Sequence, residues 1–346
     1  MDRIISTAVI GLGNSAKHFH IPFLEVSPHY HLKTIAKRSA PTEDQRKAYP
    51  HVAFTSGVDA VMQDEGIDLI VITTPNTSHY SLCRQALEHG KHVIVEKPIA
   101  VTSEEAMALH RMAKEKRLTL AVYHNRRWDG DFLTVKRLIE EDKLGKLISY
   151  ESRFDRYREE LRPQAWREQA LPGSGVLYDI GSHLIDQALY LFGMPRSVRA
   201  DVRCERGGAV DDAFDITLGY PEVSVTLRAG MLVKEATPRF TVEGERTTYQ
   251  KYGLDPQENA LKEGQLPSGA GWGQEPKERW GTLECSDDTH AIETEAGDYM
   301  AYYDDVYEAI KWGKQPSVTA KQAVDVIRII ECALESGKQG ERITII

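Results

Sequence analysis

The stretch IISTAVIGLGNSA, residues 4–16, decides the fold class of this chain. Its first seven residues are mostly apolar or β-branched, which predicts a strand over residues 4–10. The pattern Gly-x-Gly-x-x-Ala follows at once, with Gly11 suited to a tight turn and Gly13 to a close backbone approach. Ala16 permits close packing of the next helix. A strand that enters such a turn predicts a dinucleotide-binding unit, and the alternative is an ordinary glycine turn.

The residues after the first glycine would begin a helix whose amide groups hold the phosphates of a dinucleotide. Asn14 and Ser15 occupy these positions, beside the two glycines and Ala16. Pro22 should break this helix, so we expect only about one turn of it near the phosphates.

The first 125 residues alternate short β-branched runs with helical patterns, which predicts a parallel sheet with crossover helices. Strands are expected at residues 4–10, 32–36, 52–54, 68–72, 92–95 and 119–123. Amphipathic helices are expected at residues 78–89 and 103–116. These elements predict a Rossmann domain, a doubly wound parallel sheet, over residues 1–125.

After Arg126 the pattern changes to longer strand-like runs. The expected elements are a helix at 132–141, strands at 147–155, 213–218 and 223–232, a long loop at 253–282, and helices at 299–311 and 320–337. Longer strands of this kind suit an antiparallel sheet with one face packed on helices. We therefore expect an α/β protein whose second domain, residues 126–346, is α+β with a large, mostly antiparallel sheet.

Composition excludes several classes of partner. The chain has 346 residues, 41% of them hydrophobic, and a net charge of −9 without a long Lys/Arg cluster, which argues against nucleic-acid binding. A helix needs about 18 to 20 consecutive apolar residues to cross a bilayer, and no segment of this sequence approaches that number. The N-terminus does not resemble a signal peptide. Four well-separated cysteines fit no metal site and favour a reducing compartment. We expect a cytoplasmic protein with no membrane partner.

The end of the second expected strand discriminates between the two nicotinamide cofactors. An acid there binds the ribose 2′-hydroxyl, whereas an arginine accommodates a 2′-phosphate. This chain has Lys37, Arg38 and Ser39, with no acid before Glu43. The sequence therefore favours NADP, although NAD stays possible and the two cations could be a solvated surface pair.

Two further strands end in polar residues at the carboxyl edge of the sheet, where open α/β folds bind ligands. The stretch TTPNTSH places four candidates for cofactor binding there: Thr74, Pro75, Asn76 and His79. The stretch VEKPIA adds Glu96 and Lys97 directly before Pro98, which biases Lys97 toward an extended conformation. A lysine at this edge could hydrogen-bond a substrate hydroxyl, or it could be a surface lysine.

The stretch YDIGSHLIDQ, residues 178–187, places Asp179, His183 and Asp186 at i, i+4 and i+7 of an apolar helix. Such a face could serve catalysis or packing. It could also hold a metal, but no second His or Cys cluster supports that alternative, and we expect no metal. Asp186 could instead pair with a neighbouring element.

These motifs, in this order, resemble the Gfo/Idh/MocA oxidoreductases over essentially the whole chain. The stretches that look more closely like the scyllo-inositol dehydrogenases of that family, the NADP-dependent bacterial branch above all, are residues 123–139, 166–168, 178–187, 191–195 and 251–258. The resemblance implies a Rossmann domain, a second domain that binds substrate and forms a homodimer or homotetramer through its sheet, and catalytic positions at Lys97, Asp179 and His183.

In these roles His183 would be the general base, because an imidazole pKa near 6.5 lies close to working pH. Asp179 would orient its ring, and Lys97 would stabilise negative charge on the reacting oxygen. Weaker candidates for binding the hydroxyls of a polyol or sugar substrate are His124, Asn125, Arg153, Asp155, Tyr157 and Trp166. Alternation points Arg153, Asp155 and Tyr157 to one face, where they could equally form ion pairs on the sheet.

Two other functions stay open at this point. The first keeps the chemistry but acts on an aldose or a keto-sugar. The second is a cofactor-sensing regulator without catalysis, which should have lost Lys97 or His183, and the sequence keeps both. The hydroxyl epimer, the direction of the reaction and the number of subunits do not follow from spacing.

Overall fold

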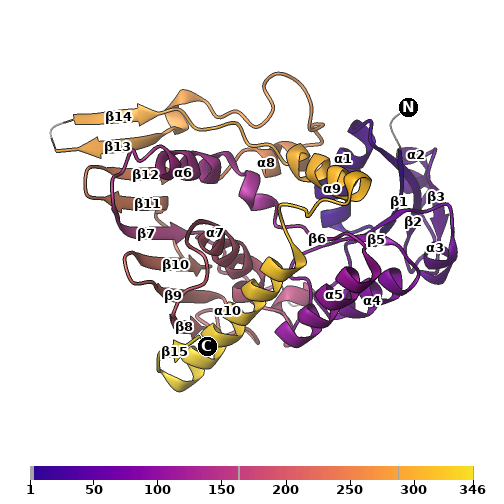
Figure 1. Cartoon of the computed structure of the whole chain (residues 1–346), viewed down its shortest axis with the longest axis horizontal. Coiled ribbons are helices and arrows are strands. Elements are labelled where there is room, and N and C mark those ends of the chain that lie inside the picture. Colours follow the sequence, from indigo (N-terminus) through magenta and orange to yellow (C-terminus); the bar gives the residue numbers. More distant parts are fainter. Residues whose placement is uncertain (1–3, 163, 287, 346) are drawn as a thin grey trace. The chain divides into compact units, whose positions relative to one another are not determined.

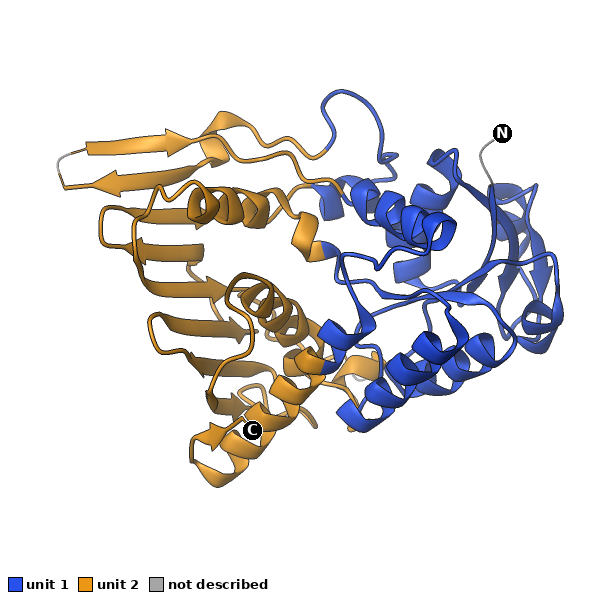
Figure 2. Cartoon of the chain, viewed as in Figure 1, with its two compact units in different colours: residues 1–125, 257–272, 299–324 blue, residues 126–256, 273–298, 325–346 orange. Residues whose placement is uncertain are grey.

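The computed structural model describes residues 4–162, 164–286 and 288–345. The chain forms two compact units (Figure 2). Unit 1 contains residues 1–125 together with 257–272 and 299–324, and unit 2 contains residues 126–256, 273–298 and 325–346. Two segments from the second half of the chain thus fold with the N-terminal residues. The domain boundary near residue 125 remains a proposal.

Unit 1 is built on a six-stranded parallel sheet in the order β3-β2-β1-β4-β5-β6. Its strands are β1 (Ile5–Ile10), β2 (Tyr30–Ala36), β3 (Ala53–Thr55), β4 (Leu69–Ile72), β5 (His92–Val95) and β6 (Leu120–Val122). Every residue of β4 is buried because helices cover both faces of the sheet (Figure 1). This strand order confirms the Rossmann sheet and places its topological switch point between β1 and β4.

Helices alternate with the strands of unit 1, as a parallel sheet requires: α1 (Ile21–Val26), α2 (Glu43–Ala48), α3 (Asp59–Gln63), α4 (His79–Glu88) and α5 (Ser103–Lys116). Unit 1 also contains α8 (Gln257–Lys262) and α9 (Met300–Trp312), which come from the second half of the chain. Thr102 caps α5 by accepting a hydrogen bond from the backbone N–H of Glu105 at 3.2 Å. The expected helices at 78–89 and 103–116 match α4 and α5 closely.

The expectation that Pro22 leaves only about one helical turn near the phosphates is wrong. A π-helical turn, η1 (Ala16–His20), runs directly into α1 (Ile21–Val26), so the chain stays helical past the proline. Pro22 lies in the first turn of α1, where its missing N–H costs nothing. The wider π-turn upstream absorbs the ring, as such turns do where the regular hydrogen-bond ladder is interrupted.

Unit 2 is built on a nine-stranded sheet in the order β14-β13-β12-β11-β7-β10-β9-β8-β15. Its strands are β7 (Leu147–Arg153), β8 (Ser197–Arg203), β9 (Ala213–Gly219), β10 (Ser224–Gly230), β11 (Pro238–Gly244), β12 (Thr248–Tyr252), β13 (Gly281–Cys285), β14 (Asp288–Ile292) and β15 (Ile343–Thr344). Only β7 and β10 pair in parallel among these described strands. The large, mostly antiparallel sheet is therefore confirmed.

Helices of unit 2 lie on one face of this sheet (Figure 1). They are α6 (Gly130–Glu140) and α7 (Ser182–Phe192), which continues a π-turn, η5 (Leu177–Gly181). The long C-terminal helix α10 (Ala320–Gln339) begins in unit 1 and ends in unit 2. Val225 and Leu227 of β10 are completely buried, in agreement with one face that packs on helices.

The expected long loop at residues 253–282 is wrong in part. It contains α8, a short helical turn at Lys277–Arg279 and the first residues of β13. Six helical residues are too few to show a clear 3.6-residue period, and tertiary contacts stabilise α8. The side-chain oxygen of Gln257 accepts hydrogen bonds from the backbone of Tyr299 and from the indole of Trp272, both within unit 1. In the described residues, no helix combines the length and apolar character needed to cross a membrane.

Candidate active site

The turn after β1 has the geometry that a dinucleotide site needs. Gly11 has φ +100°, and a Cβ there would lie 2.8 Å from Oγ1 of Thr73, so this position requires glycine. Its N–H donates to the carbonyl of Ala36 at 2.9 Å, which joins the ends of β1 and β2. A Cβ on exposed Gly13 would meet no protein atom within 4 Å. The turn therefore fits a pyrophosphate that approaches the backbone at Gly13.

The structure brings two of the predicted cofactor residues, Ser15 and Glu96, into direct contact. The hydroxyl of Ser15 donates to Oε1 of Glu96, and Nε2 of His20 lies 3.2 Å from the same oxygen. Oε2 of Glu96 accepts from the backbone N–H of Lys97 at 3.0 Å. Burial raises the pKa of Glu96, but His20, Lys97 and Ser15 outweigh it and lower the pKa to about 2. Glu96 is thus an ionised carboxylate at neutral pH.

The residues after β2 differ in how firmly the chain holds them. Nζ of Lys37 donates to the side chain of Gln45 at 2.7 Å and to the carbonyl of Ala40 at 3.3 Å. Arg38 and Ser39 are exposed. Within the described part of the chain, no hydrogen bond or ion pair holds the Arg38 guanidinium. Arg38 is therefore the side chain here that can turn toward a phosphate.

The TTPNTSH turn leads into α4 through a short helical turn, η2 (Asn76–Ser78). His79 is completely buried, with Nδ1 2.7 Å from the carbonyl of Pro98 and Nε2 2.8 Å from that of Thr74. This ring therefore ties the turn after β4 to the turn after β5. Thr74 is half-buried, Pro75 is exposed and Asn76 is buried. The contacts of His79 are structural, and they hold Thr74 at the ligand-binding edge.

Asp179 and His183 lie on the continuous helical segment that η5 and α7 form in unit 2. Oδ1 of Asp179 accepts from Nε of Arg167 at 3.1 Å, and 26% of the Asp179 side chain is exposed. His183 is buried, with 8% of the residue exposed. The arrangement places a carboxyl side chain one turn before a histidine, as the spacing predicts.

Asp186 serves a different purpose. Nε and Nη2 of Arg127 donate to its two carboxylate oxygens at 2.8 and 2.6 Å, and both side chains are at most 4% exposed. Such a buried two-point ion pair fixes geometry at both partners. Asp186 is therefore used as an anchor of α7 on the segment before α6. This contact removes the structural support for a metal site at Asp179, His183 and Asp186.

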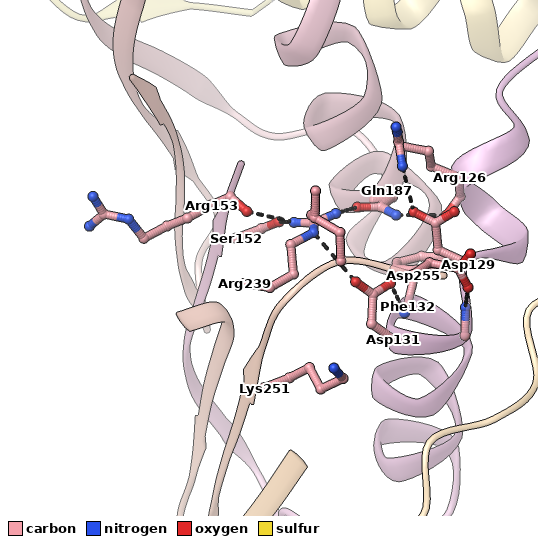
Figure 3. Close-up of polar contacts among 12 residues, drawn as sticks. Arg126, Asp129, Asp131, Phe132, Ser152, Arg153, Gln187, Arg239, Lys251 and Asp255 are labelled. Carbon is pink, nitrogen blue, oxygen red and sulfur yellow. Dashed lines mark hydrogen bonds and ion pairs between the residues drawn. The ribbon is translucent and has the colours of Figure 1, made fainter. Parts of the chain in front are cut away.

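A second anchor lies next to the first, where Arg239 of β11 reaches the polar side of α7 (Figure 3). Its guanidinium donates to Oε1 of Gln187 at 2.9 Å, and Gln187 donates in turn to the carbonyl of Arg126 at 2.7 Å. Nη1 of Arg239 also donates to the hydroxyl of Ser152 in β7, and Nε of Arg239 lies 3.6 Å from Oδ2 of Asp131. All these side chains are buried, so the network fixes the helix that carries His183 on the sheet.

The candidate substrate residues differ in their contacts. His124 and Asn125 are buried at the end of β6. Arg153 pairs with Asp155 at 2.8 Å and with Glu151 at 3.4 Å. Asp155 also accepts from the backbone of Gly230 and the hydroxyl of Thr237. These contacts support the ion-pair alternative for Arg153 and Asp155.

The two aromatic candidates are more accessible. Tyr157 is 43% exposed and lies in a β-bridge with Leu232. Trp166 is half-buried in the turn η4 (Trp166–Glu168), and the guanidinium of Arg167 lies 4.5 Å from the centre of its ring. Glu168 anchors this turn by accepting from Arg158 and from the backbone of Arg162.

Sequence reasoning missed four residues that the structure connects to candidate residues or their anchors: His20 contacts Glu96, Arg167 contacts Asp179, Arg239 contacts Gln187, and Tyr303 contacts His20. Arg167 lies beside Trp166 in the WRE stretch, and that stretch was the available signal. His20, Arg239 and Tyr303 act through partners far away in the sequence. No local pattern identifies such residues.

The comparisons with known proteins agree with this geometry. A model of an oxidoreductase family, its NAD-binding Rossmann fold, matches residues 5–124, and the model of the same family's C-terminal alpha/beta domain matches residues 136–345. Together the two matches cover most of the chain. The chain belongs to the Gfo/Idh/MocA oxidoreductase family. It is therefore an enzyme of the oxidoreductase class with an NAD-binding Rossmann domain.

This Gfo/Idh/MocA oxidoreductase is similar to named relatives over its full length. It is 39% identical to the scyllo-inositol 2-dehydrogenase (NADP(+)) IolW of Bacillus subtilis (strain 168), with 99% of this chain and 96% of the relative covered. The solved structure of the oxidoreductase yvaA from Bacillus subtilis is 38% identical with a TM-score of 0.96, covering 100% and 99% of the two chains.

A third relative differs in its cofactor. The scyllo-inositol 2-dehydrogenase (NAD(+)) of Bacillus subtilis (strain 168) is 29% identical over 206 residues. That match covers 56% of this chain and 55% of the relative. The family thus contains relatives named for either nicotinamide cofactor, so membership alone does not decide between the two.

Proposed function

We propose that this oxidoreductase transfers a hydride between a cyclic polyol and NADP, with scyllo-inositol and scyllo-inosose as the expected substrate pair. The single observation that carries the proposal is the full-length similarity to a scyllo-inositol 2-dehydrogenase named for NADP(+). The sequence adds independent chemical support, because it contains a dinucleotide turn together with an acid, a histidine and a lysine of the kinds that this reaction needs.

The cofactor would be held by the residues at the carboxyl edge of the unit 1 sheet. Backbone amides at Gly13, Asn14 and Ser15 suit the pyrophosphate, and Ala16 is fully buried where the helix packs closely. Arg38 is suited to a 2′-phosphate because its forked donors match phosphate oxygens. When bound, the nicotinamide ring would accept or supply the hydride. NAD remains the second candidate, since a shorter match is named for NAD(+).

Proton transfer would be carried out by the chain's own side chains. His183 would take the proton of the reacting hydroxyl as general base, and Asp179 would stabilise the resulting imidazolium. Lys97 would donate to the reacting oxygen and stabilise the negative charge that develops on it. The anchors at Gln187 and Asp186 support this role by fixing the helix that carries His183.

Two alternatives differ from this proposal in substrate or in class. An aldose or keto-sugar would require the same acid, histidine and lysine, and hydroxyl positions alone would separate it from an inositol. A non-catalytic regulator is disfavoured because Lys97 and His183 are both present. Trp166, Tyr157, His124 and Asn125 remain proposed contacts for hydroxyl groups of the substrate.

Assembly and location are also proposals. We infer a homodimer or homotetramer through the sheet of unit 2, with support from the resemblance to the family and from the 54% exposure of Ile148 on β7. Sedimentation analysis would test the number of subunits. A cytoplasmic location is supported by four cysteines that are free thiols.

The test is a panel of inositol epimers, aldoses and sugar phosphates, each assayed with NADP and with NAD. We expect scyllo-inositol with NADP to give the highest kcat/KM in the panel. Strong activity on a sugar phosphate, with none on any inositol, would refute the substrate. Higher kcat/KM on an aldose would favour the first alternative.

A further inference from the structure

A buried chain of hydrogen bonds lies behind the cofactor turn of unit 1, and the proposed chemistry does not use it. It begins at Tyr303 on α9, passes through the ring of His20 in η1, and ends on the carboxylate of Glu96 after β5. Nδ1 of His20 lies 2.9 Å from the Tyr303 hydroxyl, and Nε2 lies 3.2 Å from Oε1 of Glu96. His20 and Tyr303 are completely buried.

Glu96 accepts hydrogen bonds from three residues of unit 1. Oε1 accepts from Ser15 in the cofactor turn and from His20 in the first helical segment, and Oε2 accepts from the backbone N–H of Lys97. An ionised carboxylate only accepts hydrogen bonds, so Nε2 of His20 must carry the proton of that contact. The low pKa of Glu96, about 2, agrees with a carboxylate that keeps these donors at all ordinary pH values.

The ring of His20 is itself fixed by aromatic packing. Its centroid lies 4.4 Å from that of Tyr123, and 6.3 Å from that of Tyr303 in an edge-on arrangement. Tyr303 stacks on Phe23 at 5.1 Å, and its hydroxyl also lies 2.8 Å from the backbone carbonyl oxygen of Phe19. The aromatic rings of Tyr123, Tyr303 and Phe23 therefore hold the His20 ring in the position from which it donates to Glu96. Tyr303 comes from α9.

We propose that His20 is a positioning residue of the oxidoreductase reaction: through Glu96 it fixes the main chain at Lys97 relative to the cofactor turn. The importance of Lys97 rests on the function proposed above. The physical reason is that rates depend steeply on the placement of reacting groups, where an error of about 1 Å can cost about a hundredfold. Tyr303 contributes by holding the ring of His20.

The test uses two replacements of His20 that differ in one property. His20→Gln keeps an N–H donor that can reach Glu96, whereas His20→Leu has a similar size and no donor. We expect kcat to fall about tenfold or more in His20→Leu and clearly less in His20→Gln, while the Kd for NADPH changes less than about threefold. Equal kcat values in the two variants at equal melting temperature would overturn the proposal.

Tyr303→Phe removes the hydroxyl that His20 contacts and keeps the ring. Tyr307→Phe is the matched control on the same helix, because the buried Tyr307 hydroxyl has no hydrogen-bond partner among the described residues. We expect a lower kcat only in Tyr303→Phe. If both variants lose melting temperature and neither loses kcat, the Tyr303–His20 contact serves folding alone and the proposal is wrong.

A measurement without substrate separates this proposal from the proposed function. NMR of ¹³C-carboxyl-labelled glutamate, with Glu96→Gln to assign the signal, reports the titration of Glu96 directly. Loss of the His20 donor should raise the Glu96 pKa, so that Glu96 titrates at higher pH in His20→Leu than in the wild type. An unchanged titration would overturn the proposal even if inositol activity is found. A raised pKa without inositol activity would support the His20–Glu96 link and reject only the substrate.

Discussion

Arg167 holds the carboxylate of Asp179, with Nε of the arginine 3.1 Å from Oδ1 of the acid. Arg167 is 48% exposed, so the pair should add at most about 1 kcal/mol to stability. Its effect should instead be on the direction in which Asp179 points. Loss of this contact should therefore change the orientation of Asp179, and with it kcat, more than it changes the stability of the fold.

Replacing Arg167 by Gln should lower kcat about tenfold and leave the melting temperature almost unchanged, since a charge-assisted hydrogen bond to the proposed orienting acid is lost. Arg167→Lys keeps the charge, so its kcat should lie between those of the wild type and Arg167→Gln. Steady-state kinetics and thermal unfolding provide the two readouts. Normal kcat in Arg167→Gln would show that Asp179 does not depend on this contact.

The choice of cofactor should depend on Arg38. Arg38→Ala should raise the KM for NADP about tenfold or more and hardly affect that for NAD, because only NADP has a 2′-phosphate. Lys37→Ala is the matched comparison and should have the smaller effect, since Gln45 and Ala40 already engage the Lys37 ammonium. Equal changes for both cofactors in Arg38→Ala would remove the 2′-phosphate interpretation.

Much of the fold could be predicted because local patterns carry it. The strand and glycine turn at residues 4–16 and the regular alternation up to residue 123 specify the Rossmann sheet. The expectation at Pro22 failed because it treated proline as a helix breaker without considering the first turn of a new segment. The sequence did not predict α8, because its six residues are too few to show a helical period. Tertiary contacts of Gln257 stabilise this helix instead.

The candidate site divides in the same way. Asp179, His183 and Lys97 could be proposed because each lies in a short motif with unusual polarity. His20 could not, because its role depends on Glu96, which is 76 residues away, and on Tyr303, which is 283 residues away. The spacing of Asp179, His183 and Asp186 also could not show that Asp186 forms an ion pair with Arg127 and so anchors α7.

The buried pair between Arg127 and Asp186 should be essential for stability. Asp186→Leu leaves a buried guanidinium without its partner, which should cost about 3 to 5 kcal/mol of unfolding free energy. The double variant Arg127→Met with Asp186→Leu should recover most of that loss. Lys136→Met breaks an exposed pair with Glu140 in α6 and should cost about 1 kcal/mol or less. Urea unfolding measures all three, and a loss near 1 kcal/mol in Asp186→Leu would contradict the anchor role.

Asp211 should make stability depend on pH. Its Oδ2 accepts from the backbone N–H of Leu177 at 2.7 Å, at the start of η5, and burial raises its pKa from 3.8 to about 6. The folded state therefore retains this proton more strongly than the unfolded state. The contribution of Asp211 to stability should fall as pH rises from about 4 to 6, by at most about 3 kcal/mol.

Asp211→Asn keeps an acceptor for Leu177 and removes the titration, so its stability should lack this decline. The difference in unfolding free energy between variant and wild type should therefore grow as pH rises through the same window. Asp201→Asn changes an exposed carboxylate and serves as the control. Parallel stability curves for the wild type and Asp211→Asn would contradict the raised pKa.

The most direct test of the central claim, polyol oxidation with His183 as base, is the rate of NADP reduction on scyllo-inositol by the wild type and by His183→Ala. We expect the wild type to reduce NADP and the variant to lose about 10² to 10⁴ in kcat, the usual contribution of a general base. Its Kd for NADPH and its circular dichroism spectrum should match those of the wild type. Near-normal kcat in a folded His183→Ala variant, or a wild type inactive on every inositol, would contradict the claim.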